Sequence, residues 1–169
     1  DNALGGIGRP GTAFMTKIPD ELGFLLIAIH AFKNLAAERR TELLFDPWKF
    51  GSWLDQQTGS DRRAFRHMLL FLIFPESYER ISSSGQKRKI REAFADRLPS
   101  DQGKIEDWSP LTTDQVILSI RNVLENQLKN NEIDFYLPPL RSQWKESEGE
   151  VHAELHSGVS EGRHFWIEK

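Results

Sequence analysis

The sequence predicts an all-α protein, an irregular multi-helix bundle with an extended or β-like C-terminal tail. Apolar residues between 19 and 144 recur at the spacing of a helix face, and capping residues and prolines stand where helices would begin. With 169 residues, 38% of them hydrophobic, the chain can bury one core. We expect a glycine-rich loop over residues 1–18, a helical domain over 19–144, and an acidic linker over 145–169 that ends in the first strand of a truncated following domain.

The first helix is predicted from Pro19 to about Ala37. Proline fits the first helical position, and Asp20 and Glu21 complement the positive end of the helix dipole. Both sides of this segment are apolar, so we expect a central, buried helix. The residues concerned are Leu22, Leu25, Leu26 and Ile29 on one side, with Phe24, Ile27, Ala28 and Ala31 on the other.

Two shorter helices are predicted next. Asp46 followed by Pro47 is typical of a capped helix start, and the helix that follows carries Trp48 and Trp53. Ser60-Asp61 starts the second, which ends before Pro75 and should pack inward. Its apolar stripe consists of Phe65, Met68, Leu69 and Leu72.

Two further helices complete the predicted bundle. Ser83 or Ser84 can cap a helix to about Arg97, which is mostly charged and should lie at the surface. Residues 99–112 are expected to form a loop. Thr113 would cap a last long helix to about Lys129, and a short turn would end at Trp144.

Composition limits the compartment and the chemistry. The chain has no cysteine, which excludes disulfides, thiolate metal sites and cysteine nucleophiles and fits a reducing compartment. The longest apolar run, residues 22–32, is too short to span a membrane, and the first residues lack a signal peptide's features. We therefore expect a cytoplasmic fragment of a longer chain, with no membrane contact.

No motif in the sequence predicts catalysis, a metal site or a cofactor in this fragment. Residues 6–11 match a dinucleotide-binding glycine pattern, but the strand that should precede it is missing and Pro10 interrupts it. The two histidines of residues 152–156 have the spacing of a zinc-protease motif, but its glutamate is misplaced. His30 and His67 are expected to be hydrogen-bonded core histidines.

The strongest electrostatic feature is a basic segment from Glu79 to Arg97, with six cationic against three acidic side chains. Such a patch can neutralise nucleic-acid phosphates without reading sequence. The candidate phosphate-binding residues are Lys87, Arg88, Lys89 and Arg91, extended by Arg62, Arg63 and Arg66 if the two helices are neighbours. A solvated helix face with internal pairs, such as Arg88 with Glu92, is the alternative.

A second hypothesis is a protein-interaction module. An exposed aromatic surface built from Trp48, Trp53 and Trp144 could dock a partner subunit. Binding to phosphate should weaken steeply with salt, whereas an apolar interface should hardly respond, so the two hypotheses can be separated.

Several segments, taken in order, resemble the helical region of McrB-like proteins, the AAA+ subunits of modification-dependent restriction systems. They are GRPGTAF (8–14), LFDPW (44–48), LFLIFPESYERIS (70–82), KRKI (87–90), Ala93-Phe94, and FYLPPL (135–140) with Trp144. The final HFWIEK (164–169) resembles the opening strand of the EVE-type, PUA-like domain that follows this region in some relatives.

The resemblance implies a role in restriction and defence. The whole protein would recognise modified DNA, hydrolyse GTP or ATP with Mg, and recruit a nuclease subunit. None of those active residues falls on this chain. The expected function of the fragment is therefore that of a non-catalytic helical accessory region that scaffolds the parent protein or contacts DNA phosphates.

Overall fold

The computed structural model describes residues 16–60, 63–99, 106–129 and 133–145. These residues belong to two compact units, Asp1–Ile133 and Asp134–Lys169, which are taken in turn. Within the described ranges every regular element is a helix, so the predicted all-α class is confirmed there. The predicted glycine-rich loop and the acidic, strand-like tail lie outside the described residues, apart from a few at their edges.

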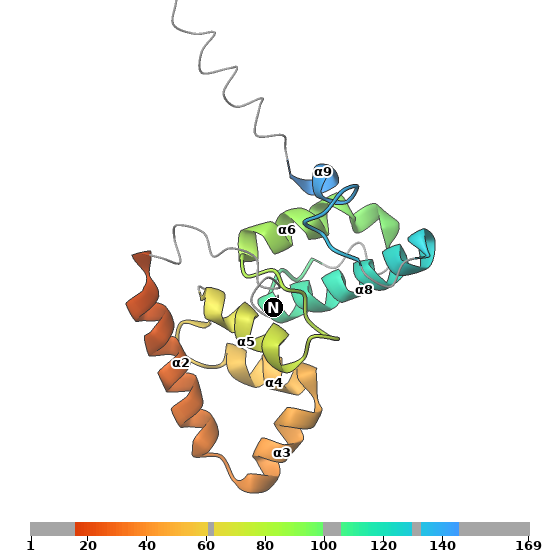
Figure 1. Cartoon of the computed structure of the whole chain (residues 1–169). Coiled ribbons are helices and arrows are strands. Elements are labelled where there is room, and N and C mark those ends of the chain that lie inside the picture. Colours follow the sequence, from red (N-terminus) through yellow and green to blue (C-terminus); the bar gives the residue numbers. More distant parts are fainter. Residues whose placement is uncertain (1–15, 61–62, 100–105, 130–132, 146–169) are drawn as a thin grey trace, which may run out of the picture. The chain divides into compact units, whose positions relative to one another are not determined.

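The first unit opens with two helices where the sequence predicted one. Helix α2 spans Ile18–Lys33, and Asn34 closes it by donating its backbone N–H to the carbonyl of His30. Helix α3, Ala37–Phe45, then follows in a new direction (Figure 1). The predicted continuation of one helix to about Ala37 is therefore wrong.

Helix α2 is not the central, buried helix that its composition predicted. Only Glu21, Phe24 and Ala28 are buried, because α2 packs mainly on one neighbour, α5. Its opposite side is open, and Leu26 is 67% exposed. Other exposed apolar residues on this helix are Ile18, Leu22, Ile27 and Ile29. The prediction that His30 is a core histidine is also wrong, since His30 is exposed and pairs with Asn34.

Helix α4, Pro47–Asp55, begins as predicted. The Asp46 carboxylate accepts hydrogen bonds from the backbone N–H groups of Trp48 and Lys49, both at 3.0 Å, and Pro47 occupies the first turn. Gly51 faces Tyr78, whose hydroxyl donates to the carbonyl of Pro47 at 2.7 Å. A Cβ atom at Gly51 would collide with that hydroxyl, so this close approach requires glycine.

Helix α5, Ala64–Ile73, receives its N-terminal cap from another helix. The carboxylate of Glu21 on α2 accepts hydrogen bonds from the backbone N–H groups of Ala64 and Phe65, at 3.2 and 2.9 Å. The residue at the cap position itself, Arg63, makes no side-chain cap and instead pairs with Asp20 at 3.3 Å. The carboxylate of Glu21 thus caps the start of α5, next to the more exposed pair of Asp20 with Arg63.

The buried side of α5 differs from the prediction. Arg66, His67 and Leu70 are buried with Met68, whereas Leu72, assigned to the inward stripe, is 62% exposed. Helix α5 can turn Arg66 inward because carboxylates of two other helices bind it, and His67 is buried beside it, as described below. The predicted stripe is therefore wrong only at Leu72, since Met68 is buried and Phe65 and Leu69 pack against the core.

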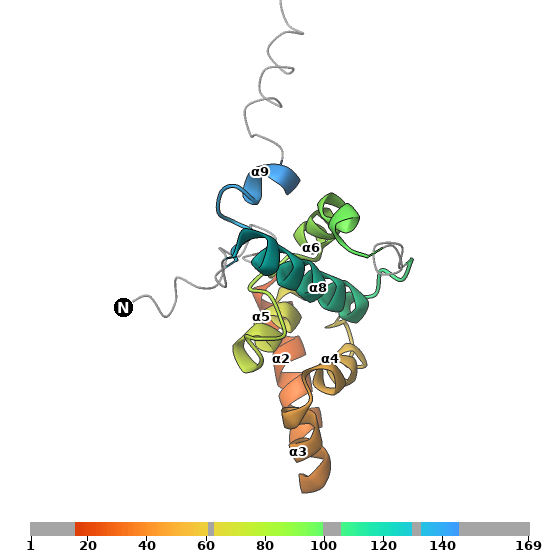
Figure 2. The ribbon, with the colours of Figure 1, turned by 90° about the vertical axis from the view of Figure 1, so that its right-hand side faces the viewer.

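The remaining helices of the unit are α6, Ser84–Ala93, the short 3-10 helix η2, Ala95–Arg97, and α8, Pro110–Leu128. Ser83 caps α6 as predicted, by accepting from the N–H of Gln86 at 3.3 Å. The cap of α8 is Ser109 with Pro110 in the first turn, so the predicted start at Thr113 was late. Helix α6 packs along α8, and α8 also contacts α4 (Figure 2).

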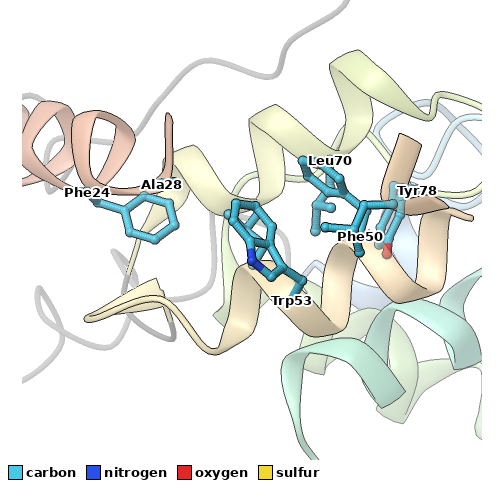
Figure 3. Close-up of a cluster of buried hydrophobic side chains, with 8 residues drawn as sticks. Phe24, Ala28, Phe50, Trp53, Leu70 and Tyr78 are labelled. Carbon is cyan, nitrogen blue, oxygen red and sulfur yellow. The ribbon is translucent and has the colours of Figure 1, made fainter. Parts of the chain in front are cut away.

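Aromatic side chains dominate the core between α2, α4 and α5. Figure 3 shows Trp53 of α4 between Phe24 of α2 and Leu70 of α5, with Phe50 of the same helix on the side of Tyr78. The rings of Phe50 and Trp53 lie 5.5 Å apart, a separation typical of favourable tilted aromatic pairs. A second apolar layer joins α6 to α8. Its buried members are Ile90, Phe94, Ile117, Ile120 and Leu124.

The second unit contains the short helix α9, Arg141–Trp144. The indole N–H of Trp144 donates to the carbonyl of Phe135 at 2.7 Å, and the ring lies edge-on to Tyr136 at 5.7 Å. This closes the turn that the sequence predicted to end at Trp144.

Candidate functional site: a buried charge network beside a cavity

Three helices of the first unit bring charged side chains together in its interior. Arg66 and His67 come from α5, Lys87 from α6 and Asp114 from the first turns of α8. All four are buried, and ionised groups in a protein interior need partners because water no longer solvates them. The local reason for the convergence is that each residue stands among the apolar positions of its own helix, as Lys87 does beside Ile90.

Arg66 is held by two carboxylates. Its side chain is 0% exposed and pairs through Nε and Nη2 with both oxygens of Asp55, at 2.5 and 2.9 Å. Its Nη1 donates to Asp114 at 2.7 Å. Burial lowers the pKa of Arg66, but the hydrogen bonds and charges of Asp55 and Asp114 outweigh it and leave the pKa above its ordinary value. The guanidinium therefore stays charged.

Lys87 depends on one carboxylate. It is 1% exposed, and its Nζ lies 2.5 Å from Asp114 and 3.1 Å from Nδ1 of His67. Burial lowers the pKa of Lys87, and Asp114 opposes that shift. Counting Arg66 and Lys87 against Asp55 and Asp114, the network carries two positive and two negative charges.

His67 sits between the network and the cavity, and its neighbours determine its tautomer. Nδ1 faces two cationic donors, Nη1 of Arg66 and Nζ of Lys87, each at 3.1 Å, so it must accept. The proton is then on Nε2, which donates to Oγ of Ser84 at 2.9 Å. Burial and the two cations lower the pKa of His67 well below its ordinary value. The prediction of a hydrogen-bonded core histidine is confirmed.

The pairing of His67 with Ser84 does not favour serine activation. A catalytic histidine accepts the serine proton and has a carboxylate behind it to stabilise the imidazolium. Here the far nitrogen of His67 faces Lys87 and Arg66. An imidazolium at this position would meet like charges, so the arrangement is suited to holding a neutral ring.

A cavity of about 220 Å³ opens beside His67. The buried His67, Lys87 and Thr113 form its floor, and the exposed Ser84, Arg88 and Trp108 stand at its mouth. The side chains around it are mostly hydrogen-bond donors. They are His67, Ser84, Lys87, Arg88, Trp108, Pro110 and Thr113.

The segment that carries Trp108 is held in place by Arg91 and Asp107. Arg91 donates to the carbonyl of Asp107 at 2.7 Å, and its guanidinium lies 3.9 Å from the centre of the Trp108 ring. The Asp107 carboxylate accepts from the backbone N–H of Ser109 at 2.8 Å and from its hydroxyl at 2.9 Å. The wall of the cavity at the start of α8 is thereby fixed.

The predicted basic patch is largely wrong. Lys87, Arg91 and Arg66 are buried in the network or against Trp108. Arg63 is half-buried and paired with Asp20, and Arg62 lies outside the described residues. Only Arg88 and Lys89 of the predicted set are both described and exposed. The physical reason is that α6 turns Lys87 and Arg91 toward α8, whose Asp114 neutralises the former.

The predicted exposed aromatic surface is also wrong. Trp53 is 8% exposed and Trp144 is 7% exposed, because each fills the interior of its own unit. Trp48 is half-buried against Tyr78, with ring centres 5.0 Å apart. These tryptophans stabilise the fold and do not form a docking face.

The glycine pattern at 6–11 and the histidine pair at 152–156 both lie outside the described residues. Within the described ranges, no group of three or more histidine or acidic side chains is arranged to hold a metal ion. No helix in those ranges is both long enough and apolar enough to cross a bilayer.

Asp55, Asp114 and Trp108 were not predicted to belong to a site. A signal for Asp114 existed in the helical spacing. Asp114 precedes Ile117 and Ile120 by three and six residues, on the side of α8 that is buried. A charged residue in register with an apolar stripe predicts a buried partner of opposite charge. Trp108 stood in a segment predicted to be loop, where no periodicity could indicate its role.

The first unit is thus an all-α domain whose interior contains a neutralised ionic network next to a donor-lined cavity. Comparisons of the chain with protein-family models, curated proteins and solved structures gave no match.

Proposed function

We propose that this chain is a non-catalytic accessory module of a McrB-like restriction or defence NTPase, and that it contacts DNA phosphates through Arg88 and Lys89. The ordered segments quoted above support the parentage, and an all-α fold accords with it. GTP or ATP with Mg, the nuclease partner and the reader of modified bases would belong to the rest of that parent protein. A cytoplasmic location fits a sequence without cysteine.

The proposed DNA contact rests on the exposure of Arg88 and Lys89 and on their lack of acidic partners within the described residues. Both are exposed at the outer side of α6, and within the described residues neither makes an ion pair with a carboxylate. Arg88 lies 5.4 Å from the centre of the Trp108 ring, with no ion pair to Glu92 in the same ranges. Unpaired surface cations are free to neutralise phosphates and release counterions.

The buried network supports this surface indirectly. Asp114 of α8 binds Lys87 of α6 and Arg66 of α5, which fixes the rotation of α6 about its axis. With Lys87 turned inward, the next two residues, Arg88 and Lys89, are turned outward. The interior therefore determines which cations a phosphate can reach.

Binding of a fluorescent DNA duplex of about 20 base pairs, followed by anisotropy at about 50 mM and about 200 mM salt, tests the proposal. The Arg88→Ala/Lys89→Ala variant should bind about 5- to 30-fold more weakly at the lower salt, since each exposed phosphate pair contributes about 0.5–1 kcal/mol. Loss of two phosphate contacts should also make the slope of log affinity against log salt concentration shallower by about 1.8.

The matched control is Arg39→Ala/Arg40→Ala, which removes the same charge from α3, a helix that packs on α4. It should bind DNA as the unmodified chain does. Equal losses in both variants would show that only net charge matters, and no loss in either would remove DNA contact from the proposal.

A further inference from the structure

The cavity behind Arg88 has the chemistry of an anion site. Its side chains include two cations, Lys87 and Arg88, and two hydroxyls, Ser84 and Thr113. No carboxylate stands among the described residues that line it. Asp114 neutralises Lys87 without being one of the residues that line the cavity, so the described lining has donors and no counter-charge.

Two donors at the cavity are not used by the protein. An ammonium has three N–H bonds, and the acceptors near Nζ of Lys87 are Asp114 and His67, which leaves one N–H. Because His67 donates to Oγ of Ser84, the hydroxyl proton of Ser84 must point elsewhere. Both residues line the cavity, so both can donate to one ligand.

The size of the cavity limits what can enter. Its volume of about 220 Å³ is below the roughly 300–1,000 Å³ of sites that enclose a whole drug-sized ligand. A volume of this size suits a phosphate group with the first atoms attached to it. The remainder of any larger ligand would stay outside, near Trp108.

The depth of the donors distinguishes a terminal phosphate from an internal one. Lys87 and Thr113 are buried, so a phosphate must enter the cavity to reach them. An internal phosphodiester has a sugar on both sides, whereas a terminal phosphomonoester has three free oxygens and one substituent. Only a terminal phosphomonoester can enter the cavity while the rest of the nucleic-acid strand leaves past Arg88.

We propose that this cavity binds the terminal phosphate of a nucleic-acid strand, with Lys87 and Thr113 donating inside and Ser84 and Arg88 at the mouth. The proposal rests on the proposed function, because Arg88 and Lys89 would hold the adjoining backbone phosphates. It adds to that function a preference for strand ends, which surface cations alone do not provide.

The test compares three ligands by anisotropy: a single strand with a terminal phosphate, the same strand with a terminal hydroxyl, and a duplex. The phosphorylated strand should bind about tenfold more tightly than the hydroxyl strand, the factor given by one charge-assisted hydrogen bond. Thr113→Val and, separately, Ser84→Ala should reduce that preference without changing the affinity for the hydroxyl strand. Far-UV circular dichroism identifies the variant that keeps its fold.

Each remaining outcome is decisive. Equal affinity for the two strands overturns the strand-end proposal, while a loss on Arg88→Ala/Lys89→Ala would leave the proposed DNA contact intact. A preference that persists in both folded cavity variants would come from charge alone and also overturns it. Competition by adenosine monophosphate at the affinity of the phosphorylated strand would assign the cavity to free nucleotides instead. Absence of binding to any strand or duplex would overturn the proposed function as well.

Discussion

Asp114 neutralises two buried cations, so replacing it with asparagine should be costly. Asp114→Asn keeps the shape of the side chain but removes the charge that faces Arg66 and Lys87. Arg66 retains Asp55, at 2.5 and 2.9 Å, whereas Lys87 loses its ion pair with Asp114 and keeps only the charge of Glu79, with which it makes no ion pair in the described ranges. Breaking a buried pair from one side costs about 3–5 kcal/mol, and we expect a loss of that size. A single domain has about 5–15 kcal/mol in total.

Urea unfolding, followed by tryptophan fluorescence and circular dichroism, measures this loss. With a slope of about 2 kcal/mol per molar urea, a loss of about 4 kcal/mol lowers the midpoint by about 2 M. Adding Lys87→Met to Asp114→Asn removes the stranded cation and should recover about 1–3 kcal/mol. The control Glu42→Gln breaks two exposed pairs, with Arg39 and Lys49, and should change the midpoint little. A loss below about 1 kcal/mol for Asp114→Asn, or strict additivity in the double variant, would refute the view that the network is tightly coupled.

Two further predictions concern His67 and Glu21. The pKa of His67 is lowered in the folded state by burial and by Lys87 and Arg66, so below its ordinary value of 6.5 the unfolded chain takes up a proton that the folded chain excludes. The free energy of unfolding should therefore fall as the pH is lowered from about 7.5 to about 5, by up to about 1.4 kcal/mol per pH unit. In urea unfolding, His67→Gln should show a shallower dependence on pH. Parallel curves for the two proteins would contradict the view that His67 stays neutral in the folded state. Glu21→Gln removes one of the two oxygens that cap α5 and should cost about 1–2 kcal/mol by thermal or urea unfolding, whereas Asp20→Asn beside it should change little. Equal effects of the two changes would show that surface charge, and not the cap, stabilises α5.

The sequence predicted well those elements that local chemistry specifies. Asp46 before Pro47 and Ser83 before α6 both act as the caps they were expected to be, because capping involves only the next few residues. The all-α class followed from apolar periodicity, which depends on many residues at once. The predicted boundaries at the start of α8 and the end of α2 were wrong by a few residues. At the start of α8, for example, both Ser109 and Thr113 are residues that can cap a helix.

The candidate site was much less predictable, because it depends on contacts across long stretches of sequence. Arg66 was assigned to a surface patch because a charge run normally faces water, yet Asp55 and Asp114 allow it to be buried. Glu21 caps a helix that begins 43 residues later, and no local pattern indicates such a partner. Leu26 was predicted to be buried because hydrophobicity does not show which side of α2 has a neighbour. In each case the deciding interaction is tertiary.

The pairing of Lys87 with Asp114 also restricts how α6 can lie along α8. An apolar contact of Ile90 with residues such as Ile117 and Ile120 would survive a slide of one helical turn, since isoleucine and leucine side chains recur along that stripe. The same slide moves Lys87 about 5.4 Å from its carboxylate and leaves two opposite charges buried apart. The ionic network therefore selects one alignment of the two helices from several that apolar packing would accept.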